Sequence, residues 1–85
     1  MNEVAVFKAL ADPTRLKILD CVKSGEKCIC EIIPLTGKSQ PNVSQHLKVM
    51  KQAGIITERK DKNRILIKAS HKELFSIITQ IKALR

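Results

Sequence analysis

The chain has 85 residues, with 16 Lys and Arg against 8 Asp and Glu, so its formal net charge at neutral pH is +8. Its hydrophobic content of 44% is typical of one small globular domain and is too high for a disordered tail. No apolar run is long enough to cross a bilayer, and three cysteines are too few for a disulfide scaffold, so we expect a cytoplasmic protein without a membrane partner.

Three helices are predicted in the first half of the chain. Asn2 can cap a helix over about 2–10, and Asp12-Pro13 starts a second helix that runs to about Lys23. A third helix begins near residue 28 and closes at Gly37. Helical spacing places the following apolar residues on inward or shared faces: Val4, Phe7 and Leu10; Leu16, Leu19 and Val22; Ile29, Ile32 and Ile33.

A fourth helix is predicted from Ser39, with Pro41 in its first turn and Gly54 after its end. At 100° per residue, Leu47 and Met50 fall close to Val43 and form a buried stripe. The opposite side has no acidic residue, although an exposed helix face usually mixes both charges. Its members are Gln40, Ser44, Gln45, Lys48 and Lys51.

A β-hairpin is predicted over about 55–69, because β-branched runs flank the turn residues Asp61-Lys62-Asn63. Ser70 and Glu73 then have the spacing of a capping box, which predicts that they start a last helix over about 71–84. That helix carries an apolar stripe of Leu74, Ile77, Ile78, Ile81 and Leu84.

The predicted fold class is mostly α with a β-hairpin wing, in the order α-α-α-α-β-β-α, and it forms one domain over 1–85. A helix-turn-helix over about 28–53 followed by a basic hairpin is a winged helix-turn-helix. Its second motif helix has the size of the DNA major groove, about 12 Å wide. Residues 38–68 hold eight basic and two acidic residues, so they carry +6 of the net +8. This block favours a nucleic-acid partner, and the alternative is a surface that only keeps the protein in solution.

Three segments resemble the ArsR/SmtB family of transcriptional repressors: 9–19 (ALADPTRLKIL), 39–50 (SQPNVSQHLKVM) and 53–60, which leads into the wing. The resemblance covers nearly the whole chain. It implies a homodimeric winged-helix repressor that binds a pseudo-palindromic DNA operator and releases it when an inducer binds. The wing tip lacks the glycine usual in the family, and we expect Asn63 to supply a left-handed turn residue instead.

The apolar stripes of the two terminal helices, over about 2–10 and 71–84, also suggest a homodimer, because a two-fold axis would bury both stripes and we do not expect so small a core to cover them. The alternative is that the stripes complete the core of one protomer. The expected interface residues are Val4, Phe7, Leu74, Ile77, Ile78 and Ile81.

Roles on DNA follow from side-chain chemistry. Gln40, Ser44 and Gln45 suit base edges, whereas the lysines suit phosphates, and His46 suits either DNA or packing at the shoulder of the helix. The expected DNA-binding set is Lys38, Ser39, Gln40, Asn42, Ser44, Gln45, His46, Lys48, Lys51, Lys60, Lys62 and Arg64.

Cys28-Ile29-Cys30-Glu31 resembles the family's Cys-x-Cys-Asp/Glu element, and the resemblance implies that Cys28 and Cys30 bind a thiophilic metal ion or As(III) as inducer. Residues two apart in a helix point away from each other, so chelation requires Cys28 to lie at or before the helix N-cap, or the first turn of the helix to unwind. Three interpretations stay open: a metal or metalloid inducer, a redox switch that uses Cys28, Cys30 or Cys21, and inert buried cysteines.

Two other classes of function compete with a sensing repressor. A winged helix can be an interaction module that senses nothing, which would show little preference among DNA sequences. An enzyme is not expected, because no nucleophile–base pair or phosphate-binding loop is apparent.

Overall fold

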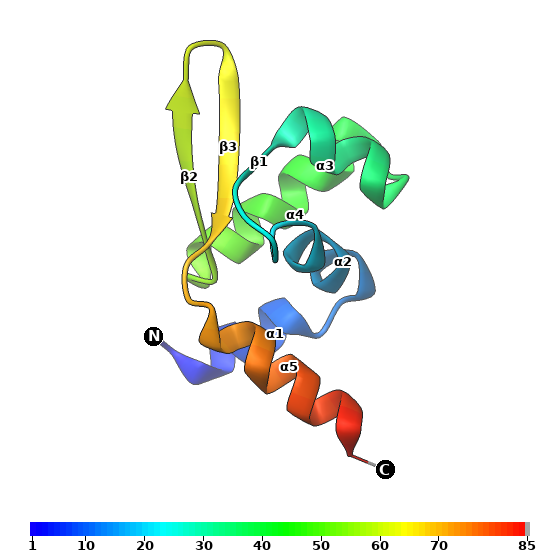
Figure 1. The fold of residues 1–85 in the computed structure, drawn as a ribbon, viewed down its shortest axis with the longest axis vertical. Coiled ribbons are helices and arrows are strands. Elements are labelled where there is room, and N and C mark those ends of the chain that lie inside the picture. Colours follow the sequence, from blue (N-terminus) through cyan, green and yellow to red (C-terminus); the bar gives the residue numbers. More distant parts are fainter. Residues whose placement is uncertain (85) are drawn as a thin grey trace.

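The computed structural model describes residues 1–84, and it confirms the winged helix-turn-helix (Figure 1). Five helices surround one core, and an antiparallel sheet of three strands includes the wing. Within these residues no helix is both long and apolar enough to span a membrane. The elements are α1 (Glu3–Leu10), α2 (Pro13–Cys21), β1 (Lys27–Cys28), α3 (Ile29–Thr36), α4 (Gln40–Gln52), β2 (Ile56–Asp61), β3 (Arg64–Ala69) and α5 (Glu73–Ala83).

Side-chain caps begin the helices where the sequence predicts them. The Asn2 side chain accepts the backbone N–H of Ala5 at 2.9 Å and starts α1. Asp12 starts α2, because its carboxylate accepts two backbone N–H groups of the first turn at 2.8 and 3.0 Å. Ser39 starts α4, and Gly37 closes α3 with a φ of 71°, a left-handed conformation that glycine adopts without strain.

The core is aliphatic and lies between the helices and the inner part of the sheet. The prediction that Leu16 points inward was wrong: Leu16 is 36% exposed and faces α5, whereas Ile18 is fully buried. The stripe of α4 is confirmed. The largest fully buried side chains are Ile18, Leu19, Ile32, Met50, Ile55, Ile67 and Val43.

The sequence interpretation missed β1. This strand has two residues, and it pairs antiparallel with β3 through the registers Lys27↔Ile67 and Cys28↔Leu66. The strand order is therefore β1-β3-β2, with β3 in the centre. As a consequence, the segment that leads into α3 is hydrogen-bonded to the wing.

The wing turns between Asp61 and Arg64, which face each other in the β2–β3 register. Lys62, not Asn63 as expected, takes the left-handed conformation of this turn, with a φ of 57°. A two-residue hairpin loop requires a positive φ at its first position in the common turn types, so the register decides which residue adopts it.

The last helix starts later than predicted, at Glu73, and its N-cap Lys72 makes no capping hydrogen bond. The expected capping box is absent because Ser70 is used elsewhere. Its hydroxyl donates to the carbonyl of Gly54 at 2.6 Å, and its backbone N–H donates to the carbonyl of Ile55. Ser70 thus ties the end of the wing to the end of α4.

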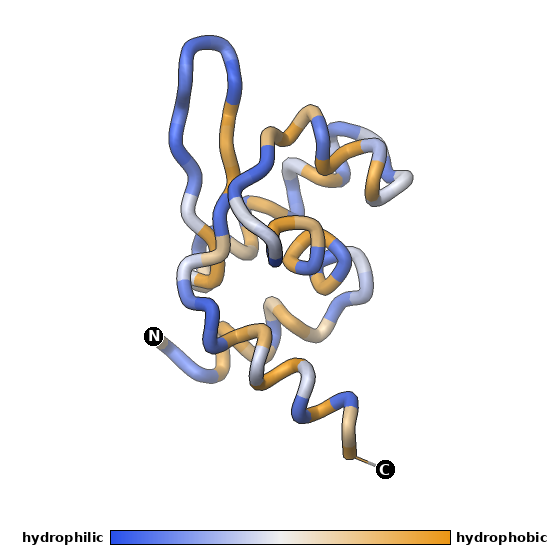
Figure 2. Tube along the Cα trace, in the orientation of Figure 1, coloured by the Kyte–Doolittle hydropathy of each residue, from blue (hydrophilic) through white to orange (hydrophobic). Residues whose placement is uncertain are grey.

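The elongated molecule, 42 × 26 × 22 Å, has two chemically different ends. The wing tip is hydrophilic, whereas α1 and α5 lie at the other end of the long axis with apolar residues along them (Figures 1 and 2). Of the six predicted interface residues, Leu74 belongs to the core at 4% exposure, and Ile78 is half-buried. The others leave an exposed apolar strip of Val4, Phe7, Ile77 and Ile81.

Candidate nucleic-acid interface

The exposed face of α4 carries polar and cationic side chains. Val43, Leu47 and Met50 are buried on its inner side. Every residue predicted for the outer side is exposed, and so are the three at the start of the helix. These exposed residues are Lys38, Ser39, Gln40, Asn42, Ser44, Gln45, Lys48 and Lys51.

Two connected hollows separate α4 from the wing. Both are lined by Ile29, Ser44 and Ile65, so together they form one groove along the outer face of α4. The hollow of about 300 Å³ is the one next to the N-terminus of α3. The other, of about 400 Å³, lies further along α4. The face that the two elements share is therefore concave. Its further lining residues include Cys28 and Cys30 at the start of α3, and the polar side chains of Gln40, Lys48, Lys51, Gln52, Glu58, Asn63 and Arg64.

Two of the predicted cations already have acidic partners in the fold. Lys51 Nζ lies 2.7 Å from Glu58 Oε1, and Arg64 Nη2 lies 3.4 Å from Glu31 Oε1. Four others form no ion pair with any residue among 1–84, so their charges are available to a polyanion. They are Lys38, Lys48, Lys60 and Lys62.

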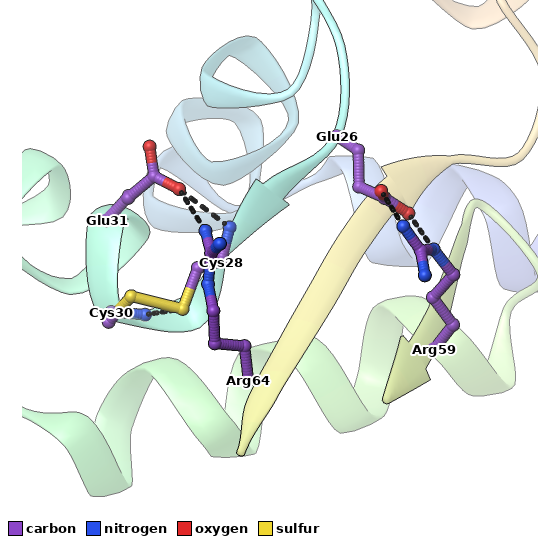
Figure 3. Close-up of polar contacts among 6 residues, drawn as sticks. All are labelled: Glu26, Cys28, Cys30, Glu31, Arg59 and Arg64. Carbon is purple, nitrogen blue, oxygen red and sulfur yellow. Dashed lines mark hydrogen bonds and ion pairs between the residues drawn. A yellow bond between two sulfur atoms is a disulfide. The ribbon is translucent and has the colours of Figure 1, made fainter. Parts of the chain in front are cut away.

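Arg59 has a structural role that sequence reasoning missed. Its guanidinium donates two hydrogen bonds of 2.8 Å to the carboxylate of Glu26, which lies just before β1 (Figure 3). The bidentate contact lowers the pKa of Glu26 and raises the pKa of Arg59. No local signal could indicate it, because the partners are 33 residues apart.

His46 points toward the body of the protein. It is half-buried, and its Nδ1 lies 3.2 Å from Arg15 Nη1. Arg15 also donates to the backbone carbonyls of Ala9 at 2.8 Å and Lys8 at 3.2 Å. This geometry favours the packed alternative over a DNA contact for His46. Arg15 therefore connects the end of α1 to α4, a role that sequence reasoning did not assign to it.

Cys28 is the N-cap of α3, with extended backbone (φ −66°, ψ 145°). It therefore lies at the position where its sulfur can approach that of Cys30, as chelation by both would require. The structure joins Cys28 and Cys30 as a disulfide. The backbone N–H of Cys30 donates to Cys28 Sγ at 3.1 Å, and that of Cys28 donates to Glu31 Oε1 at 3.1 Å (Figure 3). Cys28 is 4% exposed and Cys30 is exposed.

Within residues 1–84 of one protomer, Cys28 and Cys30 have no third side chain close enough to complete a metal site. Residues 1–84 contain no group of three His, Cys, Asp or Glu side chains that could hold a metal ion. Cys21 lies on α2, half-buried against the core. Burial, and then the charge of Asp20, raises the pKa of the Cys21 thiol, which lowers the fraction present as the reactive thiolate. Two sulfur ligands are therefore what this chain supplies at α3.

Comparisons with known proteins agree on the type of protein. The profile of the family described as bacterial regulatory protein, arsR family, matches residues 12–58. An uncharacterised helix-turn-helix transcriptional regulator of Methanocaldococcus jannaschii is 47% identical over 66% of this chain and 64% of its own length. The arsenical resistance operon repressor of Staphylococcus aureus is 36% identical over 89% of this chain and 73% of its own length.

A solved structure is similar over almost the whole chain. It is a Mycobacterium bovis fragment described as a homodimeric winged helix-turn-helix DNA-binding domain, a possible ArsR-family regulator. Its TM-score is 0.87 at 28% identity, with 94% of this chain and 77% of that chain covered.

This chain does not span the whole length of its relatives. Its match to the Methanocaldococcus regulator covers a little less than two thirds of that protein.

Proposed function

We propose, since the chain belongs to the arsR family of bacterial regulatory proteins, that it is a sequence-specific DNA-binding transcriptional repressor. The observation that carries the proposal is the shared face of α4 and the wing, which is concave, exposed and free of acidic residues along α4. In this proposal α4 enters the major groove, where Gln40, Ser44 and Gln45 read base edges. Lysines of α4 and the wing tip contact phosphates on either side.

We also propose that two protomers pair through the exposed apolar strip of α1 and α5. Water contact with Phe7, 60% exposed, and Ile81, 54% exposed, is unfavourable, and a two-fold axis at this end would bury both. The strip lies at the end of the molecule opposite the wing, so pairing leaves both α4 helices open to DNA (Figure 1). Two half-sites about 35 Å apart would then be read on one side of the duplex.

A selection experiment tests DNA recognition. The protein selects duplexes from a random pool, and the enriched sequence serves as the operator probe. Gln40→Ala and Ser44→Ala should each reduce the preference for this probe over random duplex by about 1–3 kcal/mol, because each removes a base contact. Gln80→Ala, an exposed glutamine on α5, is the matched control and should leave the preference intact. Failure to enrich any sequence would refute the repressor and favour an interaction module.

The inducer that we propose is thiol-directed and acts at Cys28 and Cys30. Adjacent sulfurs at a helix N-terminus suit a soft ion such as As(III), Cd(II) or Zn(II), with further ligands from outside this protomer. The disulfide supports a second candidate, oxidation. Two thiols and one hydrogen peroxide give the disulfide and two waters. Either event changes the link between α3 and the wing, because Cys28 pairs with β3 and caps α3 at once.

Titration of the operator complex separates the two candidates. Fully reduced protein should lose operator affinity, by about tenfold or more, when As(III), a soft metal ion or peroxide is added. Cys28→Ser and Cys30→Ser should each abolish the response, whereas Cys21→Ser should keep it. Response to the ions alone identifies metal sensing, and response to peroxide alone identifies oxidation. Unchanged affinity with all of them would remove the sensing proposal and leave the repressor.

A further inference from the structure

The two sulfurs of the disulfide differ in access to solvent. Cys28 is 4% exposed where β1 meets α3, whereas Cys30 is exposed at the first turn of α3, although both residues line the hollow between α3, α4 and the wing. A small thiolate from solvent therefore reaches Cys30 first. When the disulfide bond breaks, the negative charge of the leaving thiolate forms on Cys28 Sγ. This atom already accepts the N–H of Cys30 at 3.1 Å, at a helix N-terminus that stabilises negative charge.

Cys30 also lines the groove between α4 and the wing. The hollow beside it, of about 300 Å³, is bounded by Gln40 and Ser44 from α4 and by Asn63 and Arg64 from the wing. A group of several heavy atoms attached to Cys30 fits within this volume. It would occupy the space between the two elements that the proposed function places against DNA.

One cation of the groove can be drawn away from its present partner. Arg64 reaches from the wing toward the N-terminus of α3 and meets Glu31 at 3.4 Å, with both side chains about half exposed (Figure 3). An exposed pair of this length contributes little, so another anion can replace Glu31. Lys48, in the connected hollow, adds a second positive charge along the same groove.

We propose that Cys30 forms mixed disulfides with small anionic thiols, and that the attached group blocks the DNA-binding groove. The reaction is an exchange: the thiolate RS⁻ attacks Cys30 Sγ, the Cys28–Cys30 bond breaks, and Cys28 leaves as thiolate. The product is Cys30–S–S–R, so atoms and electrons balance without an added oxidant. Arg64 selects for a carboxylate on R. The inference rests on the proposed DNA-binding function for its consequence and on the cysteine pair for its chemistry.

The exchange itself is measured by mass spectrometry on the disulfide form of the whole chain. Its reaction with 3-mercaptopropionate is compared with that of 2-mercaptoethanol at equal thiolate concentration, with acid quenching and peptide mapping. The adduct should map to Cys30, and the anionic thiol should react about threefold faster. An adduct that maps to Cys28 or Cys21, or an equal rate for both thiols, would overturn the proposal.

Matched arginine variants locate the source of the preference. Arg64→Gln should abolish the advantage of the anionic thiol. Arg59→Gln removes the same charge from the wing, but Arg59 is held by Glu26 outside the groove lining, so this variant should keep the advantage. Glu31→Gln should increase the advantage, because it removes a competing anion. A preference that survives Arg64→Gln contradicts the assigned role of Arg64.

A trapped adduct tests the consequence for DNA. In Cys28→Ser the resolving sulfur is gone, so reaction with 3,3′-dithiodipropionate should leave a stable adduct on Cys30; Cys28→Ala is the second variant if serine disturbs the cap. The adduct should bind the selected operator at least tenfold more weakly than the same variant unmodified, and treated Cys30→Ser should bind normally. If the adduct binds the operator as well as the unmodified variant does, the blocking role is overturned and the exchange reaction is not.

If the unmodified protein binds no duplex, the proposed DNA-binding function is overturned. The exchange reaction at Cys30 is then still tested by the peptide map of the adduct.

Discussion

Lys62 combines a strained backbone with a charge at the wing tip. Its φ of 57° lies in the left-handed region, where a residue with a Cβ pays about 1 kcal/mol relative to glycine. The same residue has no ion-pair partner within residues 1–84, so its ammonium group is available to phosphate. Substitution can separate the two effects, because the backbone strain depends on the presence of a Cβ and the charge depends only on the ammonium group.

We expect Lys62→Gly to raise the free energy of unfolding by up to about 1 kcal/mol and to weaken binding to every duplex alike. Lys62→Ala is the matched variant: it removes the same charge but retains the strain, so it should weaken DNA binding equally without the gain in stability. The measurements are thermal unfolding and the salt dependence of binding, whose slope should fall by about one for each protomer, and so by about two for the proposed dimer, in both variants. Equal stability of the two variants would show that the turn is unstrained.

At the scale of an element, Asp12 determines where α2 begins. The backbone N–H of Arg15, followed by the charges of His46 and Arg15 and the N–H of Thr14, holds the pKa of the Asp12 carboxyl below its usual value, although partial burial acts in the opposite direction. A carboxyl whose pKa is lower in the folded state stabilises the fold at pH values above its ordinary pKa. That stabilisation is lost as the pH falls through the lowered value.

The pH dependence of unfolding should therefore show the contribution of Asp12. As the pH falls from 7 to below about 4, the melting temperature of the wild-type protein should fall more steeply than that of Asp12→Asn, which still caps α2 but has no charge to lose. Asp20→Asn, which removes an exposed carboxylate from the same helix, should keep the wild-type slope. Parallel curves for all three proteins would contradict this account.

Elements with local signals could be predicted from the sequence, and those that depend on distant partners could not. The caps at Asn2, Asp12 and Ser39 lie within three residues of the N–H groups that they accept, so their sequence pattern is sufficient. By contrast, two residues are too few to show alternation, and Lys27–Cys28 become a strand only because β3 lies beside them. The prediction of a capping box at Ser70 was wrong because the Ser70 hydroxyl donates its hydrogen bond to the distant carbonyl of Gly54.

The candidate site follows the same division. The exposed polar face of α4 could be predicted from helical spacing alone, whereas its partners could not. Glu31 and Arg64, like Glu26 and Arg59, are 33 residues apart, and their pairing depends on how the wing packs against β1 and the start of α3. The placement of Cys30 in the groove likewise requires the packing of three elements, which no local pattern encodes.

At the scale of the whole molecule, the apolar strip on α1 and α5 should control assembly. Introduction of charge there, with Ile77→Asp and Ile81→Asp together, should convert the proposed dimer into a folded monomer, because both positions are exposed in one protomer. Operator affinity should fall by about 100-fold or more, since a monomer contacts one half-site. Sedimentation velocity gives the mass. Leu35→Asp, at an equally exposed position on α3, is the control that should leave the mass unchanged. A wild-type protein that sediments as a monomer would refute the dimer.

The sheet has a free outer edge, and its composition affects how the protein behaves when concentrated. Beyond Ile56, every residue of β2 is exposed, and the last four are Glu58, Arg59, Lys60 and Asp61. Charged side chains along an open edge discourage strand-by-strand polymerisation between copies. At the other edge β1 ends after two residues, too short to template a fibril. Amyloid-like stacking is thereby disfavoured.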